Sequence, residues 1–150
     1  MDFAELLSDF AKRHGIDNLA SEDNAAALDI DGIVVTLVAA SDTLAVTAEI
    51  GEPPAEGAAA FADLLLEASL ESDTFFAKNR DTGNYIVVRR LSLPALDAAA
   101  FDSALEELVN LAETWRRLLA DFRPAAKAAA EASAAAPSFD AFGANGFMQV

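Results

Sequence analysis

Two aspartates separated by a single residue are the side chains in this chain best placed to do chemistry. Asp29 and Asp31 alternate with Leu28 and Ile30, and Gly32 follows them. Paired carboxylates at the end of a strand can take two different roles in a phosphoryl-transfer reaction. One attacks phosphorus, and the other transfers a proton beside a magnesium ion. That chemistry also needs a basic group to offset the phosphate charge and further carboxylates to hold the metal. The rest of the sequence must supply both.

The segment 28–33 resembles the first motif of haloacid-dehalogenase-type phosphatases, but the partners of that motif are missing. Ile33 stands where those enzymes have threonine, and no lysine or arginine occurs between His14 and Ala77. No Asp-Asp pair follows later, and the chain is short for that fold. An alternating strand that keeps its aspartates on the solvent face and enters an Asp-Gly turn explains the pattern. We therefore predict that the chain is not an enzyme, with no catalytic residue.

The other groups that could carry chemistry are isolated. His14 is the only histidine, the chain has no cysteine, and its single tryptophan, Trp115, is expected in a core or an interface. Metal-spaced histidine or cysteine clusters and glycine-rich phosphate loops are absent from the sequence, so no metal and no cofactor are predicted. The pairs Arg89-Arg90 and Arg116-Arg117 suit ion pairs with the chain's own acids or with a partner's carboxylates.

Acidity and hydrophobicity are both high in this chain. Its 150 residues carry a formal net charge of −15, yet 53% of them are hydrophobic. A strong negative field repels polyanions, and ten basic residues are too few for phosphate contacts on the scale of a nucleic-acid binder. The apolar residues must be buried in a core or against a partner. Without a signal peptide pattern or an apolar run of about 18 residues, the sequence predicts a cytoplasmic protein with no membrane span.

An apolar stripe with the spacing of one helix face opens the chain: Phe3, Leu6, Leu7 and Phe10. Asp2 and Glu5 have the spacing of a capping box, and Gly15 is a typical stop. A stripe of this kind can pack on the chain's own sheet or meet a partner, and both alternatives remain open.

The rest of the chain predicts an α+β fold. Apolar residues alternate along much of 28–50 and are interrupted by two turn signals, which predicts a three-stranded antiparallel meander. A helix over 55–70 follows, with two apolar stripes that indicate two packing partners. A β-hairpin over 74–91 and a long helix after Asp97 complete a domain predicted over residues 1–123. Residues 124–150 are predicted to be an alanine-rich spacer and a phenylalanine-containing C-terminal tail.

This order of elements resembles the class I chaperones of bacterial type III secretion, the Tir-chaperone-like family. Small size, strong acidity and an amphipathic first helix are traits of that family. Three local segments are also similar: Phe3-Ala4-Glu5-Leu6-Leu7, Leu28-Asp29-Ile30-Asp31-Gly32 and Leu64-Leu65-Leu66-Glu67-Ala68-Ser69. The resemblance covers about residues 2–122 and leaves the tail unmatched.

The resemblance implies a homodimeric cytoplasmic chaperone. It would bind the N-terminal segment of a secreted effector protein and keep it secretion-competent until a secretion ATPase receives it. The family's binding mode places partner-binding residues on the first helix and the sheet: Phe3, Leu6, Leu7, Phe10, Val35, Leu37 and Val46. It places dimer contacts, which could equally be core, on the middle helix and the next strand: Leu64, Leu65, Ala68, Phe75 and Phe76. The alternative is a non-enzymatic regulatory or scaffold protein of the same fold without secretion clients.

Overall fold

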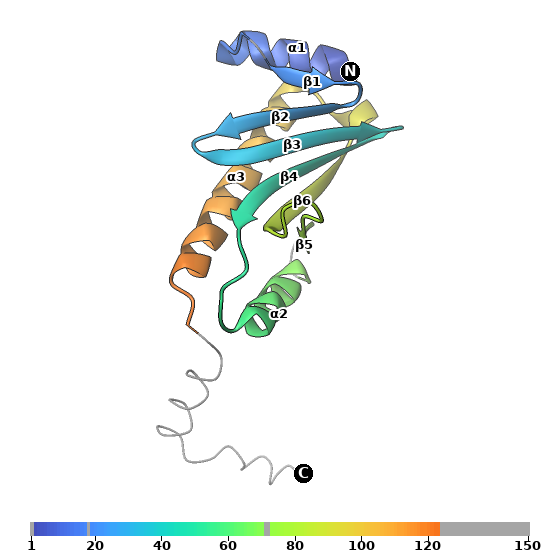
Figure 1. Cartoon of the computed structure of the whole chain (residues 1–150). Helices are drawn as coiled ribbons and strands as arrows, with labels where there is room; N and C mark the ends of the chain where they lie inside the picture. Colours follow the sequence, from blue (N-terminus) through green and yellow to red (C-terminus); the bar gives the residue numbers. More distant parts are fainter. Residues whose placement is uncertain (1, 18, 71–72, 124–150) are drawn as a thin grey trace, which may run out of the picture.

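In the computed structural model, the first and the last α-helix cover one face of a six-stranded antiparallel sheet (Figure 1). The structure describes residues 2–17, 19–70 and 73–123. The predicted tail lies outside the described residues. None of the described helices is long and apolar enough to cross a membrane. The elements in chain order are α1 (Phe3–His14), β1 (Ala20–Glu22), β2 (Ala25–Ile30), β3 (Ile33–Ala40), β4 (Thr43–Gly51), α2 (Ala58–Ser69), β5 (Thr74–Lys78), β6 (Tyr85–Ser92), a short 3-10 helix (Leu93–Ala95) and α3 (Ala98–Ala120).

Helix α1 has the ends that its sequence predicts. The Asp2 carboxylate accepts a hydrogen bond from the Glu5 backbone N–H at 2.9 Å, and the Glu5 carboxylate accepts one from the Asp2 N–H at 3.2 Å. This capping box satisfies donors that the first turn leaves free. Gly15 ends the helix with a φ of 66°, a left-handed conformation that glycine adopts without a steric cost.

The predicted meander is confirmed as β2, β3 and β4, and it turns where the Asp-Gly pair stands. Asp31 and Gly32 have φ angles of 53° and 83°, the pair of positive values typical of a two-residue type I′ hairpin. The Asp29 carboxylate accepts a hydrogen bond from the Gly32 N–H at 2.9 Å. In the structure, the Asp29 carboxylate therefore holds the turn together.

The sheet contains one strand that the sequence does not predict. Strand β1 pairs with the first half of β2, with Ala20 opposite Ala27 and Glu22 opposite Ala25. The full order is β1-β2-β3-β4-β6-β5, so β6 lies beside β4 and β5 forms one edge. The hairpin predicted over 74–91 is confirmed as β5 and β6.

Helix α2 is shorter than the predicted range 55–70, because the chain enters it through Gly57 with a φ of 79°. Phe61 on the buried side of this helix is fully buried. Its ring lies 5.5 Å from the Tyr85 ring, 5.9 Å from Trp115 and 5.1 Å from Phe122, measured between ring centroids. The Phe76 ring reaches the same tryptophan at 5.1 Å. An aromatic cluster thus joins α2, β5, β6 and the end of α3.

Helix α3 is the long helix predicted after Asp97, whose carboxylate accepts the Ala100 N–H at 2.8 Å. Its buried face lies on β3, β4 and β6. Near its C-terminal end, Arg116 donates hydrogen bonds of 3.2 Å to the carbonyl oxygens of Ile50 and Gly32. These bonds fix the helix against the end of β4 and the β2–β3 turn.

Candidate binding cavity

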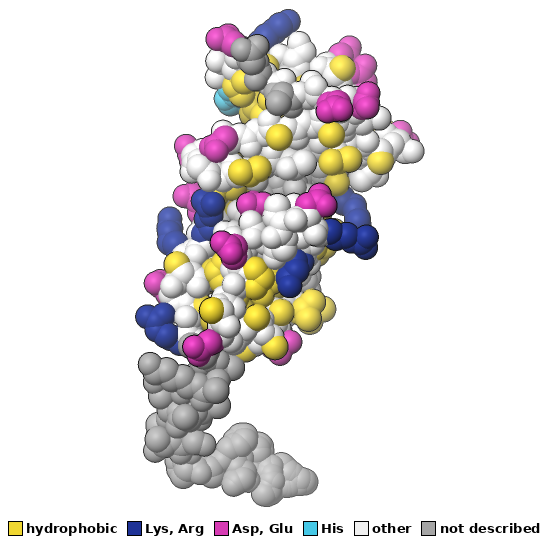
Figure 2. Space-filling view, in the orientation of Figure 1, with side chains coloured by type: hydrophobic (Ala, Val, Ile, Leu, Met, Phe, Trp, Pro, Cys, Tyr) yellow, Lys and Arg dark blue, Asp and Glu magenta, His cyan; other side chains and the backbone are white. Residues whose placement is uncertain are grey.

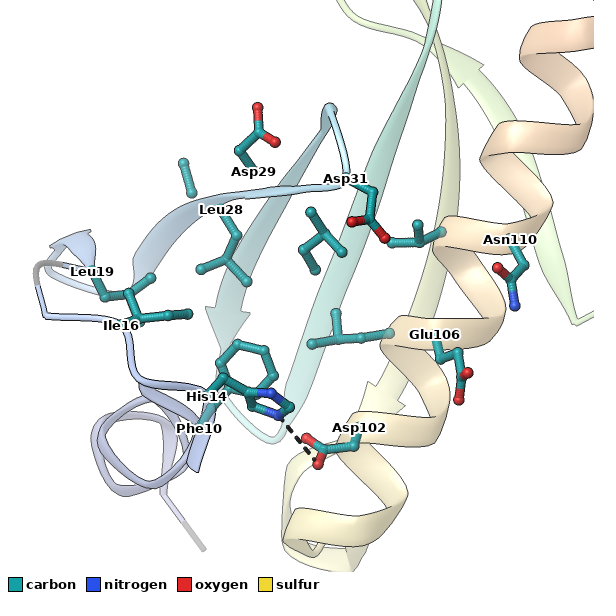
Figure 3. Close-up of a pocket in the computed structure, with 14 residues that line it drawn as sticks. Phe10, His14, Ile16, Leu19, Leu28, Asp29, Asp31, Asp102, Glu106 and Asn110 are labelled. Carbon is teal, nitrogen blue, oxygen red and sulfur yellow. Dashed lines mark ion pairs between the residues drawn. The ribbon is translucent and has the colours of Figure 1, made fainter. Parts of the chain in front are cut away.

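A cavity of about 560 Å³ opens between α1, the loop that follows it, β2 and α3 (Figure 3). This volume lies within the range of sites that bind ligands or side chains. We call it the α1–α3 cavity. Its apolar lining comes from all four segments: Phe10, Ile16, Leu19, Leu28, Leu105 and Val109.

Strand alternation supplies one wall of the cavity. Leu28 is buried and Ile30 half-buried, while Asp29 between them is exposed. Figure 3 shows Leu28 pointing into the cavity and Asp29 pointing away from it. The alternating pattern that first suggested paired catalytic carboxylates therefore turns apolar side chains toward the cavity and one aspartate toward the solvent.

The edge of β2 beside this cavity is open. Strand β1 pairs only with Ala25, Ala26 and Ala27, so the part of β2 from Leu28 to Ile30 has no strand partner on that side among the described residues. Unpaired backbone N–H and C=O groups at a sheet edge can accept an extended peptide as an additional strand. An apolar cavity and an open edge thus lie next to each other.

An ionic cluster borders the cavity through His14 and Asp102. Arg13 donates to both carboxylate oxygens of Asp102, with 3.1 Å between Nη2 and Oδ1, and its Nε donates to Asp9 at 2.7 Å. His14 Nε2 lies 3.5 Å from the same Asp102 carboxylate. The hydrogen bond from Arg13 holds the pKa of Asp102 below its ordinary value, and the bond to Asp102 raises the pKa of Arg13. The cluster fixes the C-terminal end of α1 to the first turns of α3.

Besides Asp102, three acids border the cavity: Asp29, whose carboxylate is directed away from it, Asp31 and Glu106 (Figure 3). Asp31 and Glu106 are exposed, and neither has an ion pair among the described residues. Figure 3 shows the Asp31 side chain directed toward α3, the helix that carries Glu106 and Asn110. The cavity therefore combines an apolar wall with a negatively charged rim.

The predicted partner-binding residues all lie inside the subunit. Their exposed fractions are at most 8%, and they form one core: Phe3, Leu6, Leu7, Phe10, Val35, Leu37 and Val46. Of these, only Phe10 lines the α1–α3 cavity. In the structure, the apolar stripe of α1 packs into the core of its own subunit, which is the first of the two alternatives given above. Contact of these residues with a partner stays a prediction, and Phe10 is the one with access to the cavity.

The predicted dimer residues have mixed environments. Leu64 is 44% exposed and Leu65 only 4% exposed, while Ala68, Phe75 and Phe76 are half-buried. Two leucines that the dimer prediction omits are more exposed: Leu66 at 63% and Leu70 at 85%. Figure 2 shows hydrophobic side chains gathered over the lower part of the described molecule, where Figure 1 places α2.

Sequence reasoning misses most of the cavity because its residues come from distant segments. Asp102 and Glu106 carry no motif, and Ile16 and Leu19 lie in a loop without periodicity. Leu105 belongs to the apolar stripe of the long helix. That periodicity is the only sequence signal for the side of the cavity that α3 forms.

Comparisons with known proteins agree with the fold. The profile of the Tir chaperone protein (CesT) family matches residues 5–116. The ExsC–ExsE complex contains a similar chain at 26% identity and a TM-score of 0.69, covering 77% of this chain and 91% of that one. No curated protein matches the chain significantly.

Two further structures are similar at identities that show the fold alone. The Yersinia pestis type III secretion chaperone SycH, in complex with a fragment of YscM2, has 21% identity and a TM-score of 0.61, covering 76% of this chain and 99% of that one. The ExoU–SpcU complex from the type III secretion system of Pseudomonas aeruginosa contains a chain with 16% identity and a TM-score of 0.60, covering 79% and 98%.

Proposed function

Because the chain belongs to the Tir chaperone protein (CesT) family, we propose that it binds the N-terminal segment of a type III secreted effector and keeps that segment unfolded until export. The activity is binding without a chemical reaction, and it takes place in the cytoplasm. A secretion ATPase then receives the complex. The family match supports this proposal, and so does the similar fold of the type III secretion chaperone SycH.

The observation that carries the proposal is the α1–α3 cavity beside the open edge of β2. An extended client segment would form main-chain hydrogen bonds along Leu28–Ile30 and place apolar side chains in the cavity. Ordering a flexible segment costs several kcal/mol, so the client must gain wide apolar contact elsewhere on the chaperone as well. The cavity would be an anchor point within a longer interface.

We also propose that the chaperone is a homodimer that associates through α2 and β5. Leu66 and Leu70 expose most of their side-chain surface, and β5 is an edge strand of the sheet. Leu64 on α2 and Phe75 on β5 add partly exposed apolar surface. A second copy of the chain would remove these leucines from water, which favours association by ~25 cal/mol per Å² of apolar area.

Co-expression with the N-terminal segments of secreted effectors from the same organism tests the client proposal. We expect one such segment to co-elute with the chaperone in size-exclusion chromatography and to gain protection from protease. Asn110→Trp places a large ring at the cavity rim and is expected to weaken the complex. Thr114→Trp is the matched control, because Thr114 is an exposed residue one turn further along α3 and does not line the cavity.

Two results would contradict the proposal. If both tryptophan variants weakened the complex equally, the client would bind somewhere other than the cavity. A folded, stable protein that binds no effector segment would favour the alternative, a regulatory or scaffold protein of the same fold.

A further inference from the structure

We propose that the α1–α3 cavity selects a client segment in which an apolar side chain and a lysine or arginine lie two residues apart. This inference rests on the function proposed above and specifies the chemistry of its client. It follows from three features of the cavity: the spacing of the residues on β2, the apolar surroundings of Leu28 and the acids beside Ile30.

The spacing follows from the strand that borders the cavity. Leu28 and Ile30 both line it and are two residues apart on β2. In an extended client paired with this edge, every second side chain points the same way, with a repeat of roughly 6.6 Å. One client side chain therefore lies beside Leu28, and the next on the same face lies beside Ile30.

The surroundings of Leu28 favour an apolar client side chain. Phe10 and Leu105 are buried next to the cavity, and Ile16 and Leu19 from the loop after α1 complete its lining there. A carboxylate or amide in this position would lose its hydrating water without gaining a partner, which disfavours its binding. An aliphatic or aromatic side chain gains from the same burial.

The surroundings of Ile30 favour a basic client side chain. Asp31 follows it directly, and Glu106 lies on the facing helix; neither acid has an ion pair among the described residues. Asp102, in contrast, is already paired with Arg13. A lysine or arginine can lay its aliphatic stem along Ile30 while its charged head reaches the two unpaired carboxylates. The net charge of −15 attracts such a residue from a distance as well.

Chemical-shift titration of the ¹⁵N-labelled full chain with synthetic peptides tests this selection. The probe is a serine- and threonine-based peptide with the core Leu-Ser-Lys, made also in the reverse order because either strand direction fits the edge. The matched peptides carry Gln or Glu in place of Lys. We expect shifts at Leu28–Ile30 and at Val109, and a Kd for the Lys peptide about threefold lower than for the Gln peptide, the size of exposed charge pairs. The Glu peptide should bind most weakly.

Charge-removing variants separate the local effect from the overall field. Asp31→Asn with Glu106→Gln should abolish the preference for Lys, and asparagine tolerates the positive φ of 53° at position 31. Asp42→Asn with Glu67→Gln removes the same amount of charge at exposed positions that do not line the cavity and should leave the preference intact. Raising the salt concentration should reduce the preference.

The outcomes distinguish this inference from the proposed function. Equal affinity for the Lys and Gln peptides would overturn the inference and leave the chaperone proposal standing. An equal loss of preference in both double variants would also overturn it, because the overall field would then suffice. Without cavity shifts for any peptide the inference fails, and effector co-elution then decides the proposed function separately.

Discussion

Arg13 and Asp102 join the end of α1 to the start of α3 through two hydrogen bonds between side chains 89 residues apart in the sequence. Both side chains are about one third exposed, at 32% and 33%. Solvent therefore screens the pair, and its contribution depends on salt. Its position matters more than its strength, because Asp102 borders the α1–α3 cavity.

We expect Asp102→Asn to lower the stability of the protein at neutral pH and to remove part of its acid sensitivity. The pKa of Asp102 in the folded protein is held below its ordinary value of 3.8 by the hydrogen bond from Arg13. The pair therefore stabilises the fold fully above that value, and the contribution is lost as the pH falls through the lower pKa of the folded state. Urea denaturation of the wild type and the variant at neutral and acidic pH measures the difference.

The difference between the two proteins should shrink in acid and in high salt. The sequence pI is about 4.1, so the acidic measurements need dilute protein to avoid precipitation. Identical urea midpoints for both proteins at neutral pH and low salt would show that the pair contributes nothing to the fold.

Leu6→Ala is expected to destabilise the protein by ~2–5 kcal/mol, the cost of a cavity in a well-packed core. Leu6 is fully buried between α1 and the sheet. Leu118→Ala serves as the control, because Leu118 is 49% exposed on α3. The control should change the free energy of unfolding by less than ~0.5 kcal/mol. A stable Leu6→Ala protein would mean that α1 is not packed as the structure shows.

If the proposed dimer forms through α2, we expect Leu66→Glu to convert it to a monomer while leaving the subunit folded. Leu66 is 63% exposed on α2, so the charge costs little in the isolated subunit but prevents apolar contact with a second copy. Val38→Glu is the control, since Val38 is an exposed apolar residue (43%) on β3, outside the proposed interface. Light scattering measures both masses. If the Leu66→Glu protein were still a dimer, the interface would lie outside α2.

Local signals explain why the helix ends and turns are predictable from the sequence. Asp2, Gly15, Asp97 and the Asp31-Gly32 pair each act within one turn of the chain, and the structure uses each as expected. Strand β1 has no such signal, because Ala20–Glu22 contains neither a β-branched nor an aromatic residue. It pairs with β2 because the chain folds back on it at residues 23–24.

The candidate site is less predictable because it depends on packing between distant elements. The apolar stripe of α1 identifies a buried helix face but does not say what covers it. The cavity is formed where α1, the loop after it, β2 and α3 meet, and Arg116 helps to hold α3 against the sheet through the carbonyl groups of Gly32 and Ile50. No pattern in the sequence predicts that Asp31 and Glu106 line the same cavity.

Phe61→Ala is expected to destabilise the protein by ~3–5 kcal/mol and to shift the fluorescence of the single tryptophan to longer wavelength. Phe61 is fully buried, and its ring lies edge-on to Trp115 at 5.9 Å between centroids. Removal of the ring admits water to the tryptophan and loosens α2. Phe75→Ala is the control, because Phe75 is half-buried and stacks under Arg90 at 5.0 Å. An unchanged emission spectrum in Phe61→Ala would show that the aromatic cluster does not hold α2 against the end of α3.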